Sequence, residues 1–382
     1  MHEDPPSTDA TVIVGGGFGG LTAALSLAKS VPRGPITLIE PRDRFLFQPL
    51  LYELLSGELQ SWEVAPRYNR LLSHHGINWI QERVTTLDFS ERRIKTASGQ
   101  QLNWGAVVVA TGARTNDFGI PGVADHALGF QTLEDVNSLR NKLRELRLQR
   151  RPDAALVIVG AGPTGVELAC KMADLLEGTA RLHLIEMGET VLANNAAFNR
   201  ERAAAALEKR DVTVHLKTAV TAVHPDRVEL TNGRQLSHQG LIWTAGSRPN
   251  LPPMSPDPML VGGRLAIGSD LRLIGHDQAF AIGDGSCCAE ESWPATAQVA
   301  MQQGEAVAKA LLATRGGDPP QPFHFQDRGE MLSLGLGDAT LTGMGVTLAG
   351  PIAFQIRRAA YLTRLPGLSL GIRSASAWLL GH

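Results

Sequence analysis

Cysteine is scarce, long apolar runs are absent and neither sign of charge dominates. Three cysteines in 382 residues cannot form a disulfide framework, which favours a reducing compartment. No run of about 18 uninterrupted apolar residues occurs, so we expect no membrane-spanning helix. The 36 basic and 38 acidic residues nearly cancel, which argues against a general nucleic-acid binder.

Targeting and metal-binding patterns are also missing. Residues 1–9 contain no apolar core and no arginine-rich amphipathic pattern, so we expect neither a secretory signal nor a transit peptide. No cluster of histidine, cysteine and acid has metal-ligand spacing, and the pair His74–His75 is typical of solvent-exposed histidines. We therefore predict no metal site.

The chain is organised around its first 40 residues. Thr11–Val14 is a β-branched apolar run typical of a strand, Gly15–Gly20 is a glycine-rich turn, and Leu21–Lys29 has the composition of a helix. A second strand is predicted at Ile36–Ile39, and Glu40 stands at its end. This order of strand, glycine turn, helix, strand and acid is typical of a dinucleotide-binding fold.

Each glycine of the turn has a physical purpose. Gly15 permits the tight turn, Gly17 allows the backbone to approach a pyrophosphate, and Gly20 allows the helix to pack against the strand. The helix N-terminus offers unpaired N–H groups to the anion. Glu40 is expected to accept hydrogen bonds from a ribose hydroxyl.

The same device occurs a second time. Leu156–Val159 leads into Gly160–Gly165, which includes Gly162, Pro163 and Thr164, and a helix is predicted over Val166–Leu176. A strand ends at Glu186. Two complete sites suit a cofactor that stays and a cosubstrate that visits. Since a carboxylate at 186 favours a ribose diol and Met187–Glu189 contains no cation, the residues favour NADH over NADPH.

Three further apolar strands end in small-residue turns. They are followed by Ala110-Thr111-Gly112, by Thr244-Ala245-Gly246 and by Gly283-Asp284. In a doubly wound sheet such turns lie at the carboxyl edge, where ligands bind. Asp284 is expected to face a ribityl hydroxyl or a water beside the pyrophosphate.

Two other segments carry weaker signals. Pro41–Leu55 is an apolar patch interrupted by prolines, and it is either a buried connection or a loop lining a cavity for an apolar ligand. Glu134–Arg151 is predicted to be a helix with a leucine face and a solvated arginine face. The leucines are Leu139, Leu143 and Leu146, and the arginines are Arg140, Arg144, Arg147 and Arg151.

The motifs together resemble the two-dinucleotide-fold flavoprotein reductases. Within that group FLFQPLLY at 45–52, GPTGVEL at 162–168 and AQVAMQ at 297–302 resemble the type II NAD(P)H:quinone dehydrogenases. LYELLSGELQSWEVAP at 51–66, WPATAQVAMQ at 293–302 and GEMLSLGLGDATLTGMG at 329–345 resemble most closely the cyanobacterial and plastid branch, whose members act as demethylphylloquinone reductases. The resemblance runs from Thr11 to the C-terminus.

The resemblance implies an α/β chain with two Rossmann-like dinucleotide-binding domains. The FAD domain covers 8–118 and 262–322, the inserted NAD(P)H domain covers 119–261, and a C-terminal segment for membrane association or dimerisation covers 323–382. FAD is the cofactor, and NADH or NADPH is the cosubstrate, because the branch includes NADPH users.

The resemblance also assigns residues. Glu167 lies near the nicotinamide and flavin, Ala297 and Gln298 lie against the isoalloxazine, and Gln298 and Gln302 border the quinone pocket. From the residues alone, Glu167 would be a helix-surface acid and the two glutamines one polar helix face. The remaining implied nucleotide contacts are Gly15, Gly17, Phe18, Gly19, Gly20, Glu40, Val84, Ala110, Thr111, Gly112, Asp284, Gly160, Gly162, Pro163, Thr164, Gly165, Glu186 and Gly246.

The tail at Pro351–Leu365 is expected to be a two-faced helix. Ile352, Ile356, Ala359 and Thr363 share one stripe; Phe354, Tyr361 and Leu365 share the opposite one, with Arg357, Arg358 and Arg364 at its edges. Because a quinone is dissolved in lipid, we expect the stripe of Phe354 and Tyr361 to rest on a membrane, peripherally on the cytoplasmic face of a thylakoid or plasma membrane. Packing of both stripes within the protein or in a homodimer is the alternative.

The expected function is an FAD-dependent NAD(P)H:quinone oxidoreductase that does not pump protons and reduces a membrane naphthoquinone such as demethylphylloquinone. Alternatives are a reductase of a small iron–sulfur protein and a non-enzymatic redox-sensing protein. A catalytic disulfide is not expected, because adjacent cysteines such as Cys287 and Cys288 bridge only with backbone strain. A pair of Cys170 with Cys288, as in sulfide:quinone reductases, is a further alternative.

Overall fold

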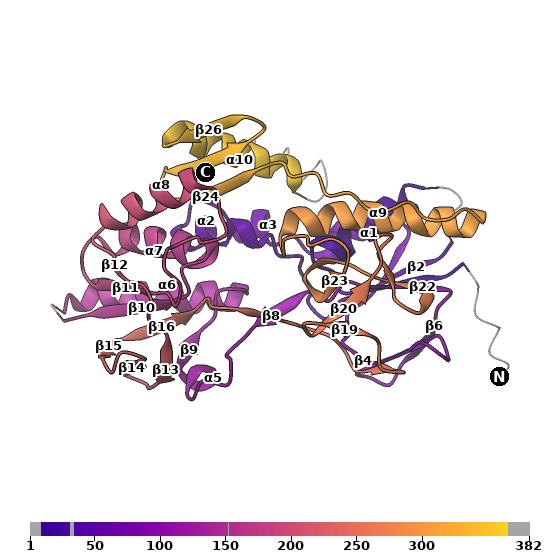
Figure 1. Cartoon of the computed structure of the whole chain (residues 1–382), viewed down its shortest axis with the longest axis horizontal. Coiled ribbons are helices and arrows are strands. Elements are labelled where there is room, and N and C mark those ends of the chain that lie inside the picture. The colour runs from indigo at the N-terminus through magenta and orange to yellow at the C-terminus, as the bar shows by residue number, and fades with distance from the viewer. Residues whose placement is uncertain (1–8, 31–33, 152, 366–382) are drawn as a thin grey trace. The chain divides into compact units, whose positions relative to one another are not determined.

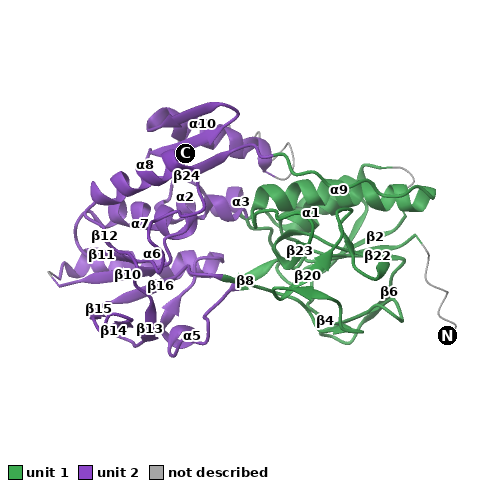
Figure 2. Ribbon diagram, viewed as in Figure 1, with its two compact units in different colours: residues 1–46, 65–114, 247–326 green, residues 47–64, 115–246, 327–382 purple. Residues whose placement is uncertain are grey.

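A computed structural model describes residues 9–30, 34–151 and 153–365 (Figure 1). The chain divides into two units, each assembled from three separate segments (Figure 2). Unit 1 comprises residues 1–46, 65–114 and 247–326, and unit 2 comprises residues 47–64, 115–246 and 327–382. The four-part division that the sequence predicts stays a prediction. The expectation about a targeting segment concerns residues 1–9, nearly all of which lie outside the described residues.

Unit 1 is built on a nine-stranded sheet with a parallel centre. The order is β19-β20-β21-β22-β7-β1-β2-β3, and β23 pairs with β20. The centre is buried because β1 (Thr11–Val14) and β7 (Ala106–Val109) consist of β-branched or small apolar residues, as a sheet covered on both faces requires. The other strands are β2 (Ile36–Ile39), β3 (Ile77–Ile80), β19 (Leu260–Val261), β20 (Arg264–Ile267), β21 (Arg272–Leu273), β22 (His276–Ala281) and β23 (Ser286–Cys288).

Two helices of unit 1 lie side by side over this sheet. Helix α1 (Phe18–Ala28) packs on α9 (Ala297–Gly316), and Gly304 makes the close approach possible (Figure 1). A Cβ on Gly304 would lie 2.5 Å from the carbonyl oxygen of Gly19. A second sheet and two short helices complete the unit: β4 (Val84–Asp88), β5 (Arg93–Thr96), β6 (Gln101–Asn103), β18 (Met254–Ser255), α4 (Tyr68–Leu72) and η2 (Gly283–Gly285). Strands β8 (Ala113–Thr115) and β17 (Ser247–Pro249) form a separate pair.

Unit 2 repeats the plan around a five-stranded parallel sheet. Its order is β12-β11-β10-β16-β9, with β10 (Ala155–Val159) at the centre between β11 (Arg181–Ile185) and β16 (Gly240–Trp243). The outer strands are β9 (Ala127–Leu128) and β12 (Thr213–His215). An antiparallel sheet of β13 (Val220–Val223), β14 (Arg227–Leu230) and β15 (Gln235–Ser237) shares a hydrophobic core with it.

The two central helices that the sequence predicts in unit 2, at 134–151 and 166–176, form with small shifts at their ends, and further helices appear that it does not predict. Helix α6 (Leu133–Gln149) begins at a capping box of Thr132 and Asp135 and buries its leucine face. In the predicted segment Pro41–Leu55 most apolar residues from Phe45 on are buried, while Pro41–Asp43 and Gln48 are exposed, and the segment forms η1 (Gln48–Leu50) and α2 (Leu51–Ser56). Its two predicted alternatives, a connection and a cavity lining, stay predictions. The remaining helices are α3 (Ser61–Val64), α5 (Val123–His126), α7 (Pro163–Leu176) and α8 (Ala197–Glu208).

The C-terminal part of unit 2 is a three-stranded antiparallel sheet covered by a helix. Strands β24 (Glu330–Ser333), β25 (Ala339–Gly343) and β26 (Val346–Ala349) pair in order, and α10 (Pro351–Arg364) packs on β25 and β26 (Figure 1). The expected helix therefore forms. Residues 366–382 of the predicted membrane segment lie outside the described residues.

The expected orientation of α10 is wrong. Phe354 and Tyr361, which we expected at a membrane, are buried against the protein, while Ile352 is 68% exposed and Ile356 is 39% exposed. Arg357, expected at the lipid head groups, is fully buried. The two stripes have similar apolar content, so helical periodicity alone could not decide which one faces the core. Among the described residues, no helix is both long enough and apolar enough to cross a bilayer.

Candidate functional site

The first glycine turn has the geometry that its sequence predicts. Gly15 has φ +100°, which favours glycine, and a Cβ on Gly20 would lie 1.9 Å from the carbonyl oxygen of Gly15. Open space lies in front of Gly17, which caps α1 without a side-chain hydrogen bond. Gly19 and Phe18 form the first turn of α1, and the Phe18 ring packs edge-on against Phe45 at 5.2 Å. The turn therefore leaves N–H groups and room for a pyrophosphate.

Glu40 is fixed at the end of β2 by backbone groups and one cation. Its carboxylate accepts hydrogen bonds from Gly16 N at 2.7 Å and Arg42 N at 3.0 Å, and it pairs with Arg42 Nε at 2.7 Å. Burial alone would raise the pKa of Glu40. The Arg42 guanidinium and the two N–H groups outweigh burial and lower that pKa. Sequence analysis missed Arg42, although it stands only two residues after the predicted acid.

The other predicted flavin residues gather at the carboxyl edge of the unit 1 sheet. Ala110, Thr111 and Gly112 follow β7, and Asp284 lies in η2 after β22. The Thr111 hydroxyl is buried and has no hydrogen-bond partner among the described residues, as a group that contacts a bound cofactor would be. Burial raises the pKa of Asp284 despite nearby Arg264. Val84, the first residue of β4, is buried.

Helix α9 presents the predicted flavin and quinone residues. Ala297 is its first residue, and Thr296 caps it by accepting a hydrogen bond from Val299 N at 3.2 Å. Gln298 and Gln302 follow one turn apart and are half-buried. Gln302 is already engaged, since it donates to the carbonyl oxygen of Gln326 at 2.9 Å and accepts from Gln326 N at 3.0 Å. The neighbouring Gln303, which sequence analysis missed, is buried and accepts from Gly283 N at 2.7 Å.

The second glycine turn repeats the first almost atom for atom. Gly160 has φ +99°, and a Cβ on Gly165 would lie 1.8 Å from the carbonyl oxygen of Gly160. Gly162 caps α7 with open space in front of it, and Pro163 and Thr164 begin the helix. Glu186 accepts from Ala161 N and from Gly188 N, both at 2.7 Å. Both turns therefore have the form of dinucleotide sites.

The end of β11 differs from its prediction in one respect. The sequence around Met187–Glu189 contains no cation, but Lys217 lies beside it: Lys217 N donates to Gly188 O at 2.9 Å, and its Nζ pairs with Glu189 at 2.8 Å. The expectation that no cation lies near Met187–Glu189 is therefore wrong, because the folded chain brings Lys217 to this segment. Lys217 follows β12, which pairs with β11, so parallel pairing brings the two segments together.

Gly246 lies beside an exposed aromatic ring that sequence analysis did not consider. Gly246 has φ +68°, and a Cβ there would lie 2.3 Å from the Phe118 ring. Phe118 has φ +52° and is 59% exposed. An exposed ring at the carboxyl edge of this sheet offers a stacking surface to an aromatic ligand.

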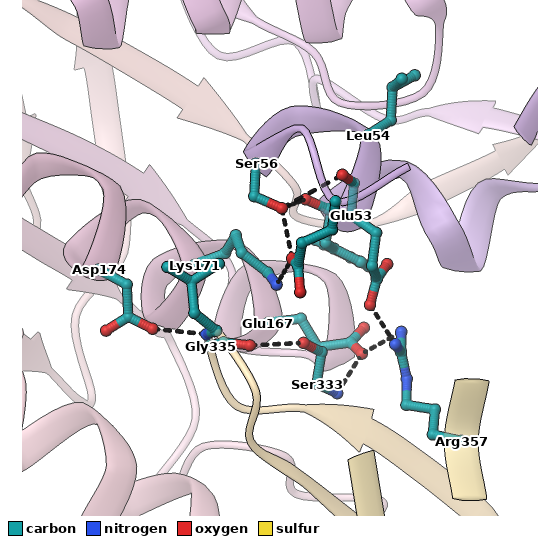
Figure 3. Close-up of polar contacts among 12 residues, drawn as sticks. Glu53, Leu54, Ser56, Glu167, Lys171, Asp174, Ser333, Gly335 and Arg357 are labelled. Atoms are coloured by element: carbon teal, nitrogen blue, oxygen red, sulfur yellow. Dashed lines mark hydrogen bonds and ion pairs between the residues drawn. The ribbon is translucent and has the colours of Figure 1, made fainter. Parts of the chain in front are cut away.

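Glu167 is the centre of a buried group of charges in unit 2 (Figure 3). It lies on α7 and accepts a hydrogen bond from Ser333 N at 2.7 Å, and Arg357 Nη2 lies 3.6 Å from the same carboxylate oxygen. Arg357 also pairs with buried Glu53 and donates to Pro49 O at 2.9 Å. Glu167 is therefore a buried, paired acid and not a helix-surface acid.

The charge state of this group follows from its burial. Burial raises the pKa of Glu167 to about 7, although Arg357 and the Ser333 N–H act in the opposite direction. Burial would lower the pKa of Arg357, but Glu53 and Glu167 raise it above its usual value. Arg357 therefore stays charged, while Glu167 exchanges a proton near neutral pH.

Besides Arg357, a second buried cation lies on α7, one helical turn after Glu167. Lys171 is fully buried and pairs with Glu58 at 2.6 Å, and Glu58 also accepts from Ser56 (Figure 3). One face of α7 thus carries an acid and a base that segments distant in sequence hold in place.

The three cysteines of the chain differ in their burial but not in their state. Cys170, Cys287 and Cys288 are free. Burial raises the pKa of Cys170 to about 12, so its thiol is not a nucleophile at neutral pH. Among the described residues, no group of three histidine, cysteine or acidic side chains has a metal-binding arrangement.

Two glycine turns, each after a central parallel strand of its sheet, are typical of an oxidoreductase that uses two dinucleotides. The model of the pyridine nucleotide-disulphide oxidoreductase family matches residues 9–304. The chain is 36% identical to the demethylphylloquinone reductase of Synechocystis sp., over 96% of this chain and 95% of that protein. It is 33% identical to the alternative NAD(P)H-ubiquinone oxidoreductase C1 of Arabidopsis thaliana, over 93% of this chain and 77% of that protein.

A solved structure shows the same fold. The structure of NDH2 from Plasmodium falciparum in complex with NADH has a TM-score of 0.89 to this chain at 18% identity and covers 98% of each chain. The chain belongs to the pyridine nucleotide-disulphide oxidoreductase family and, within it, to the type II NAD(P)H:quinone oxidoreductases. The predictions of an NAD(P)H:quinone oxidoreductase and of FAD with NAD(P)H as its cofactors are thereby confirmed.

Proposed function

We propose that the chain reduces a demethylated naphthoquinone such as demethylphylloquinone with electrons from NADH. One observation carries the proposal: Glu167 follows the second glycine turn on the same helix and is held buried with a pKa near 7. A proton-exchanging acid one turn beyond a nucleotide turn suits a reaction that transfers a hydride and delivers protons to a quinone. The first turn and Thr111 suit a resident dinucleotide.

The residues of the chain divide the work. A bound FAD supplies the hydride acceptor and the electron donor to the quinone. Gly15, Gly17 and Gly20 with the α1 N-terminus would hold its pyrophosphate, Glu40 would accept from its ribose, and Asp284 would contact its ribityl chain. Gly160, Gly162 and Gly165 do the same for NADH, whose ribose diol meets Glu186. Glu167 orients the nicotinamide end and holds a proton on its carboxylate.

The quinone end rests on α9. Ala297 and Gln298, at the start of α9, would contact the flavin ring, and Gln302 is hydrogen-bonded to the backbone of Gln326. Stopped-flow reduction of the flavin by NADH and by NADPH, followed by reoxidation with demethylated, methylated and benzoquinone acceptors in lipid, tests the proposal. We expect fastest reduction by NADH and fastest reoxidation by the demethylated naphthoquinone. Equal reoxidation by all acceptors would contradict the substrate assignment.

We also propose peripheral attachment to the cytoplasmic face of a thylakoid or plasma membrane, but through the opposite stripe of α10 from the one that the sequence favoured. Exposed Ile352 and Ile356 share one side of the helix, and Met344, 89% exposed, lies at the turn between β25 and β26, the strands on which α10 packs. Half-buried Arg358 and Arg364 lie on the same helix. This combination suits an interface with anionic head groups.

Flotation with anionic liposomes tests the attachment. The variant Ile352→Ser/Ile356→Ser should reduce the bound fraction several-fold, since it removes two apolar side chains from the interface. The matched control Leu260→Ser/Val261→Ser alters two exposed apolar residues of unit 1 and should leave flotation unchanged. If the α10 variant floats normally but sediments as a smaller species than the parent, the stripe is a homodimer contact instead.

A further inference from the structure

A cleft in unit 2 is lined by arginines and belongs to neither glycine turn. It encloses about 890 Å³ between the C-terminal ends of α2, α6 and α7 and the start of β11. Glu177 is its one acidic lining residue. Six arginines line it: Arg140, Arg144, Arg147, Arg150, Arg151 and Arg181. The arginines of α6 are exposed, as the sequence predicts, and they line this concave surface.

The local structure uses only some of these charges. Arg140 donates to the carbonyl oxygens of Leu54 and Leu55. Arg147 pairs with Glu177 at 3.3 Å, and Arg151 pairs with Asp153 at 3.5 Å. The guanidinium groups of Arg144 and Arg181 form no hydrogen bond or ion pair with any residue that the structure describes. The cleft thus keeps several charges available to a ligand.

Helix capping does not account for the cluster. The C-terminal end of a helix carries roughly half of a negative elementary charge at most, and three such ends together offset about one and a half positive charges. The six lining arginines meet one lining acid, Glu177, and Asp153 pairs with one of them from beside the cleft, so four positive charges remain without an acidic partner. Since like charges in a concave site repel one another, a bound anion lowers the energy of the cleft.

The position of the cleft separates it from the nicotinamide nucleotide site. The second glycine turn begins at Gly160, beyond the carboxyl end of β10. Ala154 and Arg181, which line the cleft, lie at the amino ends of β10 and β11, and these strands are parallel. The cleft and the glycine turn therefore lie at opposite edges of one sheet.

Shape and lining indicate the class of ligand. The volume falls within the roughly 300–1,000 Å³ of small-molecule sites, and a concave surface suits a small molecule better than a bilayer. Guanidinium groups bind phosphate oxygens in a bidentate manner, and Leu143, Leu148 and Leu175 provide an apolar wall. We propose that this cleft binds a small organic polyphosphate, of the size and charge of a nucleoside triphosphate.

Calorimetric titration of the FAD-loaded full chain with ATP and with inorganic tripolyphosphate tests the proposal. The variant Arg144→Gln/Arg181→Gln should weaken binding of both probes at least about tenfold, because each lost guanidinium removes a charge-assisted contact. The matched control Arg202→Gln/Arg234→Gln removes two exposed arginines of the same unit outside the cleft and should bind as the parent does. Unchanged thermal unfolding and unchanged flavin reduction by NADH would show that both variants fold.

Three results would overturn the proposal. Equal affinities in the cleft variant and its control would show that the arginines do not bind the probes. Loss of ATP binding when NAD⁺ is saturating would assign the probe to the second glycine turn. Weaker flotation of the cleft variant with phosphatidylglycerol vesicles, without any binding of ATP by the parent, would assign the arginines to lipid head groups.

Discussion

The two glycine turns share a backbone and differ in what surrounds them. Gly15 and Gly160 have φ angles of +100° and +99°, and the helix glycine approaches the turn equally closely in both. The acids differ. Glu40 is 3% exposed and paired with Arg42, whereas Glu186 is half-buried and bound only by backbone N–H groups among the described residues. A buried, ion-paired acid suits the binding site of a cofactor that stays, and a more exposed acid without a cation partner suits that of a cosubstrate that leaves.

The helices after the two turns show a second difference. Thr22 on α1 has the place that Glu167 has on α7, seven residues after the first glycine of the turn. Thr22 packs against α9, where a Cβ on Gly304 would lie 2.9 Å from it. Glu167 instead meets Ser333 and Arg357. The same helical position thus serves packing in unit 1 and charge in unit 2.

The largest expected effect comes from adding a methyl group at the helix glycine that lies closest to the backbone of each glycine turn. Gly20→Ala places a Cβ 1.9 Å from a backbone oxygen and Gly165→Ala places one at 1.8 Å, so the helix must shift in both variants. We expect a loss of about 3 kcal/mol of unfolding free energy in each. Gly20→Ala should purify without flavin colour, whereas Gly165→Ala should keep its flavin but be reduced by NADH roughly 100-fold more slowly.

Gly316→Ala is the control for this pair. It adds a methyl group at the end of α9, where the nearest atom is 3.9 Å away, and should change the unfolding free energy by less than about 0.5 kcal/mol. Absorbance at the flavin band and chemical denaturation measure both quantities. Loss of flavin from Gly165→Ala with retention by Gly20→Ala would reverse the assignment of the two turns.

The second prediction concerns opposite pH dependence in the two units. The folded pKa of Glu40 is lowered, so its stabilising contribution is present above its unfolded pKa and is lost as the pH falls. The folded pKa of Glu167 is raised from 4.5 to about 7, so its contribution is present below pH 4.5 and is lost as the pH rises through 7. That loss amounts to roughly 3 kcal/mol.

Denaturation of Glu167→Gln at pH 5 and pH 8 measures this contribution. The amide cannot ionise, so the decline in unfolding free energy between the two values should largely disappear. Arg357→Met should make the unfolding free energy fall more steeply with pH, because Glu167 loses its cation. Arg357→Lys keeps a cation and should bring the slope back toward that of the parent. An unchanged slope in Glu167→Gln would show that Glu167 does not titrate in this range.

Sequence predicted most of what depends on local pattern. β-Branched runs, glycine spacing and terminal acids located both parallel sheets and both turns, because each signal lies within about 30 residues. The helical form of the proline-interrupted segment was not predicted. Pro49 is tolerated at the start of a helix, and the segment forms η1 and α2. Lys217 and Ser333 carry no local signal, since only strand pairing and chain crossing bring them to Glu189 and Glu167.

The burial of Arg357 is another feature that local sequence pattern could not predict. Three arginines lie on α10, and the sequence places all of them at the edge of an apolar stripe. Only Arg357 is buried, because two distant acids meet it there. A buried cation cannot be recognised before its partners are placed, since burial of a charge is tolerated only when it is paired.

The smallest expected effect sharpens the comparison between the two acids. Glu186→Gln removes the charge that repels a 2′-phosphate while keeping a hydrogen-bond acceptor for a ribose hydroxyl, and Lys217 lies near the same turn. The ratio of kcat/KM for NADPH to that for NADH should therefore rise about five- to tenfold, with the NADH value changed less than threefold. Glu189→Gln, which removes only the exposed partner of Lys217, should raise the ratio less. An unchanged ratio in Glu186→Gln would mean that Glu186, at the end of β11, does not contact the ribose. The contrast between Glu186 and Glu40 would then rest on their burial alone.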